Sequence, residues 1–108
     1  MPSTTINRGN ILSTTVIGPS LTPAATASYT SAVQTFNVAG LIPGDLIEAV
    51  GHTGVQTAGI VIGECDCYTN GVLSVQFLNV TNASATAVSG TYYFTVIRLD
   101  GPAPINMA

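Results

Sequence analysis

Charged residues are almost missing from this chain, and their scarcity excludes several classes of partner. Only 6% of the 108 residues are charged, lysine does not occur, and the two arginines are Arg8 and Arg98. Nucleic-acid binding draws much of its affinity from clustered cations that displace counterions from phosphates, and a polybasic membrane contact needs a similar cluster. Since the net charge is -3, we expect neither nucleic acid nor a membrane among the partners.

Long hydrophobic runs are also lacking. The apolar runs are far shorter than the roughly 18 residues that indicate a membrane-spanning helix. The first ten residues, MPSTTINRGN, contain no hydrophobic stretch of the kind that a secretory signal needs. We therefore expect neither a membrane span nor a standard secretory signal.

What the chain does contain is an apolar fraction of 46%, which favours a folded chain over a disordered one. A length of 108 residues is typical of one domain with its own core. Soluble monomers usually carry interspersed charges that oppose association, whereas the cores of interfaces are depleted in charge. The composition therefore indicates a subunit that works in an assembly; the alternative is a polar soluble monomer.

The first 32 residues differ from the rest in composition. They are rich in Ser, Thr, Ala and Pro; ILSTTVI within them could form a strand, but two prolines then interrupt any regular element. We predict three parts: an extended N-terminal arm (1–32), a β-domain (33–100) and a C-terminal tail (101–108). The candidate interface residues of the arm are its apolar ones: Ile11, Leu12, Val16, Ile17 and Leu21.

From residue 33 onward, short runs with alternating apolar residues are separated by turn signals. In LIPGD, Pro43 and Gly44 suit the two central positions of a type II turn. No segment repeats apolar residues at helical spacing over two turns. The expected strands fall within 33–38, 45–50, 55–68, 72–80 and 91–99. We predict an all-β fold, an antiparallel β-sandwich or small barrel with little or no helix.

The turn at Asn70-Gly71 decides which side chains face the core. A two-residue loop would place Asp66 on the apolar face of the hairpin. A three-residue loop, Thr69–Gly71, turns Asp66 outward and sets Cys65 opposite Val75; since a slip of one residue exchanges the faces, burial favours the longer loop. The predicted core is Phe36, Val38, Cys65, Cys67, Leu73, Val75, Phe77, Phe94 and Val96.

Residues that could carry chemistry are few and scattered. Cys65 and Cys67 form a single C-x-C pair, whereas a tetrahedral zinc site needs four ligands; we interpret the pair as small core residues, with metal binding or a cross-link between subunits as alternatives. His52 lies in a Gly-rich turn without a residue to position it. The five carboxylates (Asp45, Glu48, Glu64, Asp66 and Asp100) do not mark a glycosidase pair. We expect no catalytic residue, no metal site, no cofactor and no enzymatic activity.

Two N-glycosylation sequons and four tyrosines complete the candidate features. The sequons begin at Asn79 and Asn82, in a stretch rich in Asn, Ser and Thr, and we interpret them as loop composition. The tyrosines could line a sugar-binding face, but the adjacent Tyr92 and Tyr93 must point to opposite sides of a strand. Neither feature therefore predicts a site.

Two longer stretches, TFNVAGLIPGDLIEAV and SVQFLNVTNASATAVSGTYYFTVIR, together with the Ser/Thr/Pro-rich segment before them, resemble small β-sandwich virion proteins of tailed bacteriophages. The similarity covers about residues 33–99 and lies in turns and core positions. It comprises a Phe-x-Val-x-Gly-Leu-x-x-Gly-Asp run at 36–45, an Asn-x-Thr loop at 79–83 and a closing Gly-Thr-Tyr strand at 90–98.

The resemblance implies a head decoration (cement) protein that binds the outer surface of a capsid, stabilises the shell and is made in the host cytoplasm. Its partners would be the major capsid protein and further copies of itself, as a dimer or trimer. The arm would lie over neighbouring capsid subunits and place its apolar residues in shallow pockets. The alternatives are a minor tail, fibre or spike component, and a non-catalytic carbohydrate-binding module.

Overall fold

The computed structural model describes residues 10–101, and every regular element in this range is a β-strand. The strands are β1 (Ile11–Ile17), β2 (Ser20–Leu21), β3 (Ala25–Thr26), β4 (Ser31–Asn37), β5 (Leu46–His52), β6 (Ile60–Thr69), β7 (Val72–Asn79), β8 (Ala85–Thr86) and β9 (Gly90–Leu99). Residues 10–101 contain no helix, and so none that could cross a membrane. The predicted all-β fold is confirmed.

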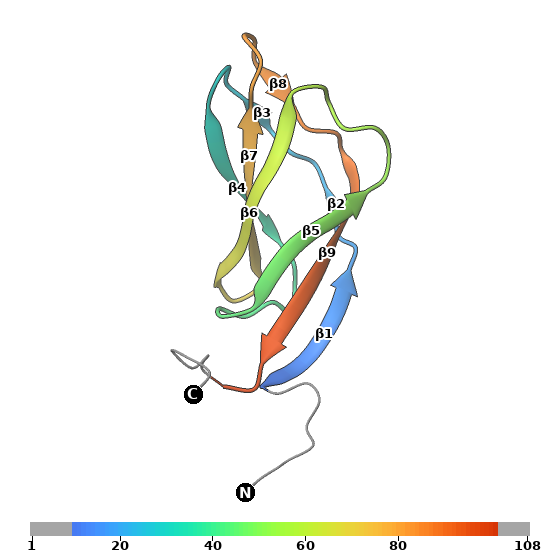
Figure 1. Cartoon of the computed structure of the whole chain (residues 1–108), viewed down its shortest axis with the longest axis vertical. Coiled ribbons are helices and arrows are strands. Elements are labelled where there is room, and N and C mark those ends of the chain that lie inside the picture. The colour runs from blue at the N-terminus through green and yellow to red at the C-terminus, as the bar shows by residue number, and fades with distance from the viewer. Residues whose placement is uncertain (1–9, 102–108) are drawn as a thin grey trace, which may run out of the picture.

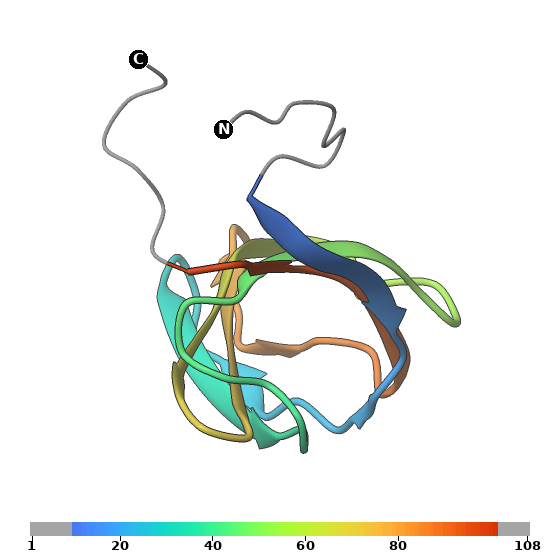
Figure 2. The same cartoon turned by 90° about the horizontal axis from the view of Figure 1, so that it is seen from below.

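The main sheet is antiparallel and curls around the core (Figures 1 and 2). Its long strands follow the order β1-β9-β5-β6-β7-β4, and β2 joins β9 beyond the end of β1. β3 and β8 form a separate two-stranded sheet. This arrangement agrees with the predicted β-sandwich or small barrel.

The interior is filled by side chains that alternate with exposed ones along the strands, as the period of two in a β-strand requires. In β9, Tyr92, Phe94 and Val96 are buried, while the residues between them are exposed or half-buried. Seven of the nine predicted core residues are buried: Cys65, Cys67, Leu73, Val75, Phe77, Phe94 and Val96. The other two, Phe36 and Val38, are partly buried and pack against this cluster.

The predicted arm differs from the structure, because its described part belongs to the main sheet. β1 pairs with β9 over its whole length, and Ile17 lies opposite Phe94. Leu21, at the end of β2, is only 2% exposed and is part of the core. The chain therefore shows no boundary between an arm and a domain at residue 32.

The physical reason is that the run ILSTTVI favours a strand and β9 offers it an edge with free backbone groups. The prolines end β1 and keep β2 and β3 short, but they do not release the segment from the domain. Residues 1–9 of the predicted arm and residues 102–108 of the predicted tail lie outside the described residues.

An ion pair between the buried Asp45 carboxylate and the partly exposed Arg98 guanidinium fixes the connection between β4 and β5. Gly44 has a φ of +96°, and Asp45 N donates to Ile42 O at 3.2 Å, as in the predicted type II turn. The buried Asp45 carboxylate accepts hydrogen bonds from Arg98 of β9 at 2.9 and 2.7 Å and from Ile42 N at 3.1 Å. Arg98 also donates to Gly40 O at 2.7 Å. The Arg98 hydrogen bonds lower the pKa of the Asp45 carboxyl, while its burial opposes the shift.

In the β6–β7 hairpin the predicted residues face the core, but the loop is shorter than predicted. Cys65 lies opposite Val75, as expected. However, Thr69 pairs with Val72, so the loop consists of Asn70-Gly71 alone. An irregularity in β6 just before Thr69 restores the register, because a β-bulge places an extra residue on one strand. The predicted three-residue loop is therefore wrong, although the predicted facing of the cysteines is right.

A buried asparagine joins three segments at the end of β7. Asn79 is 2% exposed, and its amide nitrogen donates to Thr26 O at 2.9 Å and to Ala83 O at 2.8 Å. Its amide oxygen accepts from the backbone N–H of Thr81 at 2.9 Å and from the Thr81 hydroxyl at 2.6 Å. The side chain thus fastens β3 and the following loop to β7, and its burial leaves no room for a glycan on this sequon.

Thr26 allows a test of this polar cluster. Its buried Oγ1 has no hydrogen-bond partner among the described residues. Valine keeps the shape and removes a hydroxyl whose unsatisfied burial costs about 1–3 kcal/mol. We expect Thr26→Val to raise the free energy of unfolding, measured by urea denaturation, by about 1 kcal/mol. The control is Thr35→Val, on the exposed side of β4, which should change it by less than about 0.5 kcal/mol. A loss of stability in Thr26→Val would show that the hydroxyl has a partner.

Candidate functional site

The outward surface of β1, β9 and β5 carries a continuous set of apolar side chains, and we call it the outer face. It consists of the alternate residues of the three strands that point away from the core. Thr14 of β1, Ile97 of β9 and Leu46 of β5 form one row across it. Its apolar members in register are Val16, Leu46, Tyr93, Ile97 and Leu99. Leu12 and Val50 are exposed at the irregularities of β1 and β5 and extend this set.

The outer face is well exposed and nearly uncharged. Val16 is 62% exposed, and Leu12 and Leu46 are each 52% exposed. Among the outward residues of β1, β5 and β9, Glu48 is the only charged one. An antiparallel sheet that covers a core on one side usually presents polar residues on the other, and contiguous exposed apolar patches mark interaction sites. The outer face is therefore the first candidate docking surface.

Tyr93 lies close to the backbone at one end of the outer face. A Cβ atom on Gly18 would lie 3.1 Å from Cε1 of the Tyr93 ring, and one on Gly51 would lie 3.9 Å from Cδ2. The two glycines thus give the ring its space, and 40% of the residue remains exposed. Tyrosines with an apolar ring and a polar tip are enriched at protein interfaces.

At the other end the surface is hollowed. The hollow measures about 590 Å³ and lies beside the turn between β4 and β5. Its apolar lining includes Ile42, Pro43, Leu46 and Leu99. Since Leu46 and Leu99 also belong to the outer face, the two surfaces are continuous.

The predicted interface residues are divided between the surface and the core. Leu12 and Val16 lie exposed on the outer face, whereas Ile17 and Leu21 pack in or against the core and Ile11 is half-buried. A strand turns alternate side chains inward, so a segment that forms part of the sheet cannot offer all five to a partner.

Most of the outer face was missed by the sequence analysis. Leu46, Val50, Tyr93, Ile97 and Leu99 lie in strands that the sequence predicts, but it does not predict that these strands pair with each other and with β1. The signal in the sequence is that DLIEAV and TYYFTVIRL carry apolar residues at both odd and even positions. A strand has this pattern when both of its sides are covered.

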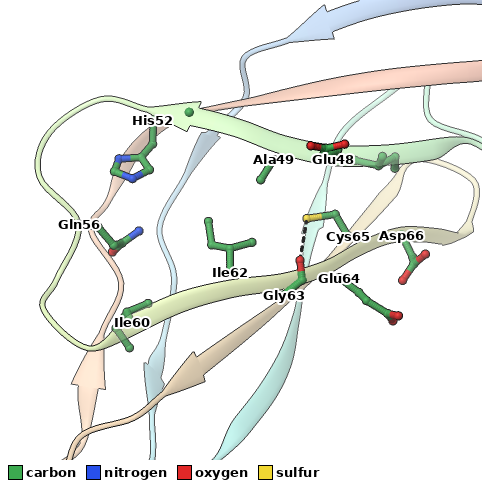
Figure 3. A pocket seen from close by; sticks show the side chains of 12 residues that line it. Glu48, Ala49, His52, Gln56, Ile60, Ile62, Gly63, Glu64, Cys65 and Asp66 are labelled. Carbon is green, nitrogen blue, oxygen red and sulfur yellow. Dashed lines mark hydrogen bonds between the residues drawn. The ribbon is translucent and has the colours of Figure 1, made fainter.

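A second surface feature is a groove between β5 and β6 (Figure 3). Among the described residues the two strands pair only where Ile47 meets Cys65, and beyond this point they enclose about 670 Å³. Ala49 and Ile62 point into the space between the strands, and Ile60 lies at the start of β6. The lining also includes three carboxylates, Glu48, Glu64 and Asp66, of which Glu64 and Asp66 leave β6 on the side away from β5.

The cysteines in this region are suited to packing rather than to reactivity. Cys65 and Cys67 are free and buried. Burial raises the pKa of the Cys65 thiol to about 11, against the opposing effect of a hydrogen bond with the Ala49 backbone. Since the thiolate is the nucleophile and the metal ligand, a thiol that stays protonated near neutral pH is poor in both roles. Within residues 10–101, no three His, Cys, Asp or Glu side chains are placed to hold a metal ion.

His52 and the four tyrosines do not form a common site. His52, predicted in an exposed turn, is instead the half-buried last residue of β5, with its ring centroid 5.4 Å from that of Tyr92. Tyr92 is buried, and Tyr93 lies on the outer face. The two exposed tyrosines belong to different segments: Tyr29 precedes β4, and Tyr68, near the end of β6, donates to Asp66 at 3.0 Å. This distribution does not provide a row of exposed aromatic rings for a sugar.

Comparison with protein families, with curated proteins and with solved structures finds no match to this chain. The fold and its surfaces therefore define the protein by geometry: a small antiparallel β-sandwich or barrel with an apolar outer face and an acidic groove.

Proposed function

We propose that this chain is a structural virion protein that binds the outer surface of a tailed-phage capsid as a decoration or cement subunit. The observation that carries the proposal is the outer face, where exposed apolar residues spread over three strands with Glu48 as the only charge. The kind of partner, a major capsid protein, follows from the resemblance of residues 33–99 to small phage virion proteins.

The outer face suits a permanent contact better than a free surface. Covering apolar side chains is favourable by about 25 cal/mol per Å² removed from water. Serine and threonine between them, such as Thr14 and Thr95, cost less to desolvate than lysine or glutamate would. Tyr93 supplies an aromatic anchor at one end of the face, and the hollow beside Leu46 and Leu99 can receive a side chain of the partner at the other.

Each such contact would be modest, and its effect on a shell would come from repetition. A protein that binds only the assembled shell stabilises it by mass action, and a dimer or trimer that touches several capsid subunits at once gains avidity. The proposed role needs no catalytic group. It requires only that the domain keep its shape while bound.

The experiment is a copy-number measurement on purified particles, followed by binding of matched variants to shells that lack the protein. Quantitative mass spectrometry should give a ratio to the major capsid protein near one or a simple fraction of it. Val16→Asp should weaken shell binding at least about tenfold, because it places a charge in a desolvated contact. Val33→Asp is the control, since Val33 is 63% exposed but lies on β4, at the opposite edge of the sheet.

Equal shell binding by the two aspartate variants would contradict the role of the outer face. A handful of copies per particle would place the protein in the tail, a fibre or a spike instead. Absence from particles would overturn the virion assignment altogether.

A further inference from the structure

The groove between β5 and β6 has the form of a missing strand. The neighbouring pairs β5–β9 and β6–β7 run along most of their strands, whereas β5 and β6 share one bridge, at Ile47 and Cys65. From there the strands diverge, and Figure 3 shows the open space between them. Two strand edges that face each other across such a space can both hydrogen-bond to an inserted extended segment.

An irregularity in each of β5 and β6 keeps the groove between them open. The pairing of β5 with β9 shifts between Ala49 and Gly51, and the pairing of β6 with β7 shifts between Ile62 and Cys65. Irregularities of this kind bend and twist a strand away from its neighbour.

The shift in β6 is supported by a side chain of β7. The Gln76 side chain lies against Gly63, where a Cβ atom would stand only 2.3 Å from Gln76 Oε1. The same oxygen accepts a hydrogen bond from Glu64 N at 3.2 Å. Gln76 therefore takes the place of a regular ladder partner and holds this part of β6 in its bent course.

The groove is apolar at its base and acidic along its edges. Ala49 and Ile62 project between the strands, where alternate side chains of an inserted segment would cover them. Glu48 and Glu64 are exposed, and Asp66 is half-buried. The groove thus favours an extended segment with some apolar or β-branched residues and a positive charge.

The distribution of charge over the described residues also favours a positively charged segment in the groove. The single cation within residues 10–101 is Arg98, and Asp45 neutralises it. Of the four remaining carboxylates in that range, all except Asp100 line the groove. The groove is therefore the most acidic part of the described surface, and no cation of the described chain balances it.

The chain itself contains a matching sequence outside the described residues. Met1–Gly9, MPSTTINRG, includes Arg8, which is the only other Arg or Lys in the sequence, and no acidic residue. Its Thr, Thr and Ile residues are of the type that favours strands. At roughly 3.3 Å per residue, nine extended residues reach about 30 Å, which is longer than the five-residue stretch from Glu48 to His52 that borders the groove.

We propose that the groove binds residues 1–9 of a second copy of this chain, as a strand added between β5 and β6, with Arg8 placed among Glu48, Glu64 and Asp66. The contact is head-to-tail, since a segment of one copy enters the groove of the next, and it generates a ring if the rotation closes. It concerns self-assembly in solution and holds or fails independently of capsid binding.

The test is a charge exchange in the full-length chain, with the assembly state measured by sedimentation velocity. The wild type should sediment as a species heavier than the monomer. The assembled fraction should decrease at high salt, because salt screens ion pairs. Arg8→Glu and Glu64→Lys should each shift the protein toward monomer, and the double variant should recover the assembly. Asp100→Lys, an acid outside the groove, is the matched control and should leave assembly unchanged.

A direct measurement uses the Arg8→Glu chain as receptor and a synthetic peptide of residues 1–10 as probe. The peptide should perturb the backbone NMR signals of residues 48–52 and 60–66, and adding Glu64→Lys to the receptor should weaken binding about tenfold, as the loss of one favourable contact predicts. A monomeric wild type, assembly that Arg8→Glu leaves unchanged, or peptide signals elsewhere on the domain would each overturn the proposal.

Discussion

Replacing Asn79 with alanine should lower the free energy of unfolding by about 3 kcal/mol, because several buried polar groups would lose their partners at once and each such loss costs about 1–3 kcal/mol. Thr26 O, Ala83 O and the N–H of Thr81 all bond to the Asn79 side chain, which is itself 2% exposed. The change is measured by urea denaturation at neutral pH. Hydrogen exchange should quicken first in residues 24–30 and 80–86, which this side chain holds against the end of β7.

The neighbouring sequon provides the control for this prediction. Asn82 is exposed, so Asn82→Ala should change the stability by less than about 0.5 kcal/mol. An Asn79→Ala variant that lost less than about 1 kcal/mol would show that water satisfies the orphaned groups. In that case the hydrogen bonds of Asn79 would not be what secures β3 and the following loop.

The structural features that the sequence predicts correctly are those set by residues close to one another in the chain. The all-β class and the Pro43-Gly44 turn follow from local periodicity and from the φ preferences of two residue types. The facing of Cys65 follows from burial across one short hairpin. These features need no knowledge of which distant strands meet.

The features that were missed depend on long-range pairing. The sequence predicts an extended arm where the structure has β1, because the partner strand β9 begins more than seventy residues later, at Gly90. The outer face exists only once β1, β9 and β5 lie side by side, and the groove exists only because irregularities separate β5 from β6. The sequence indicates only loop composition at Asn79, because the sequon describes the residues next to it and not Thr26, which lies 53 positions away.

The Asp45–Arg98 ion pair combines both kinds of information. The turn that precedes Asp45 is local, but the guanidinium that holds the carboxylate comes from the last strand. Bidentate pairs of this kind fix geometry as well as charge. The pair therefore anchors the hollow beside the outer face, and its loss would affect the shape of the proposed docking surface as well as stability.

Asp45→Asn should lower the free energy of unfolding by about 2 kcal/mol at pH 7, the range measured for buried hydrogen bonds to charged groups. Arg98 holds the pKa of the Asp45 carboxyl below its ordinary value of 3.8 in the folded protein. The contribution of the ionised carboxyl is therefore complete well above pH 3.8 and is lost as the pH falls through the lower, folded-state pKa. Urea denaturation of the wild type and of Asp45→Asn should thus differ at pH 7 and converge as the pH falls below 3.8.

A double-mutant cycle separates the pair from the turn. If the carboxylate acts through Arg98, the Asp45→Asn change should cost much less in an Arg98→Met background, because the charged partner is already gone. The exposed acid Asp100 serves as the comparison, and Asp100→Asn should show no such coupling. A cost of Asp45→Asn that is the same in both backgrounds would mean that the carboxylate stabilises the domain through Ile42 N alone, and the pH dependence would then follow from that hydrogen bond.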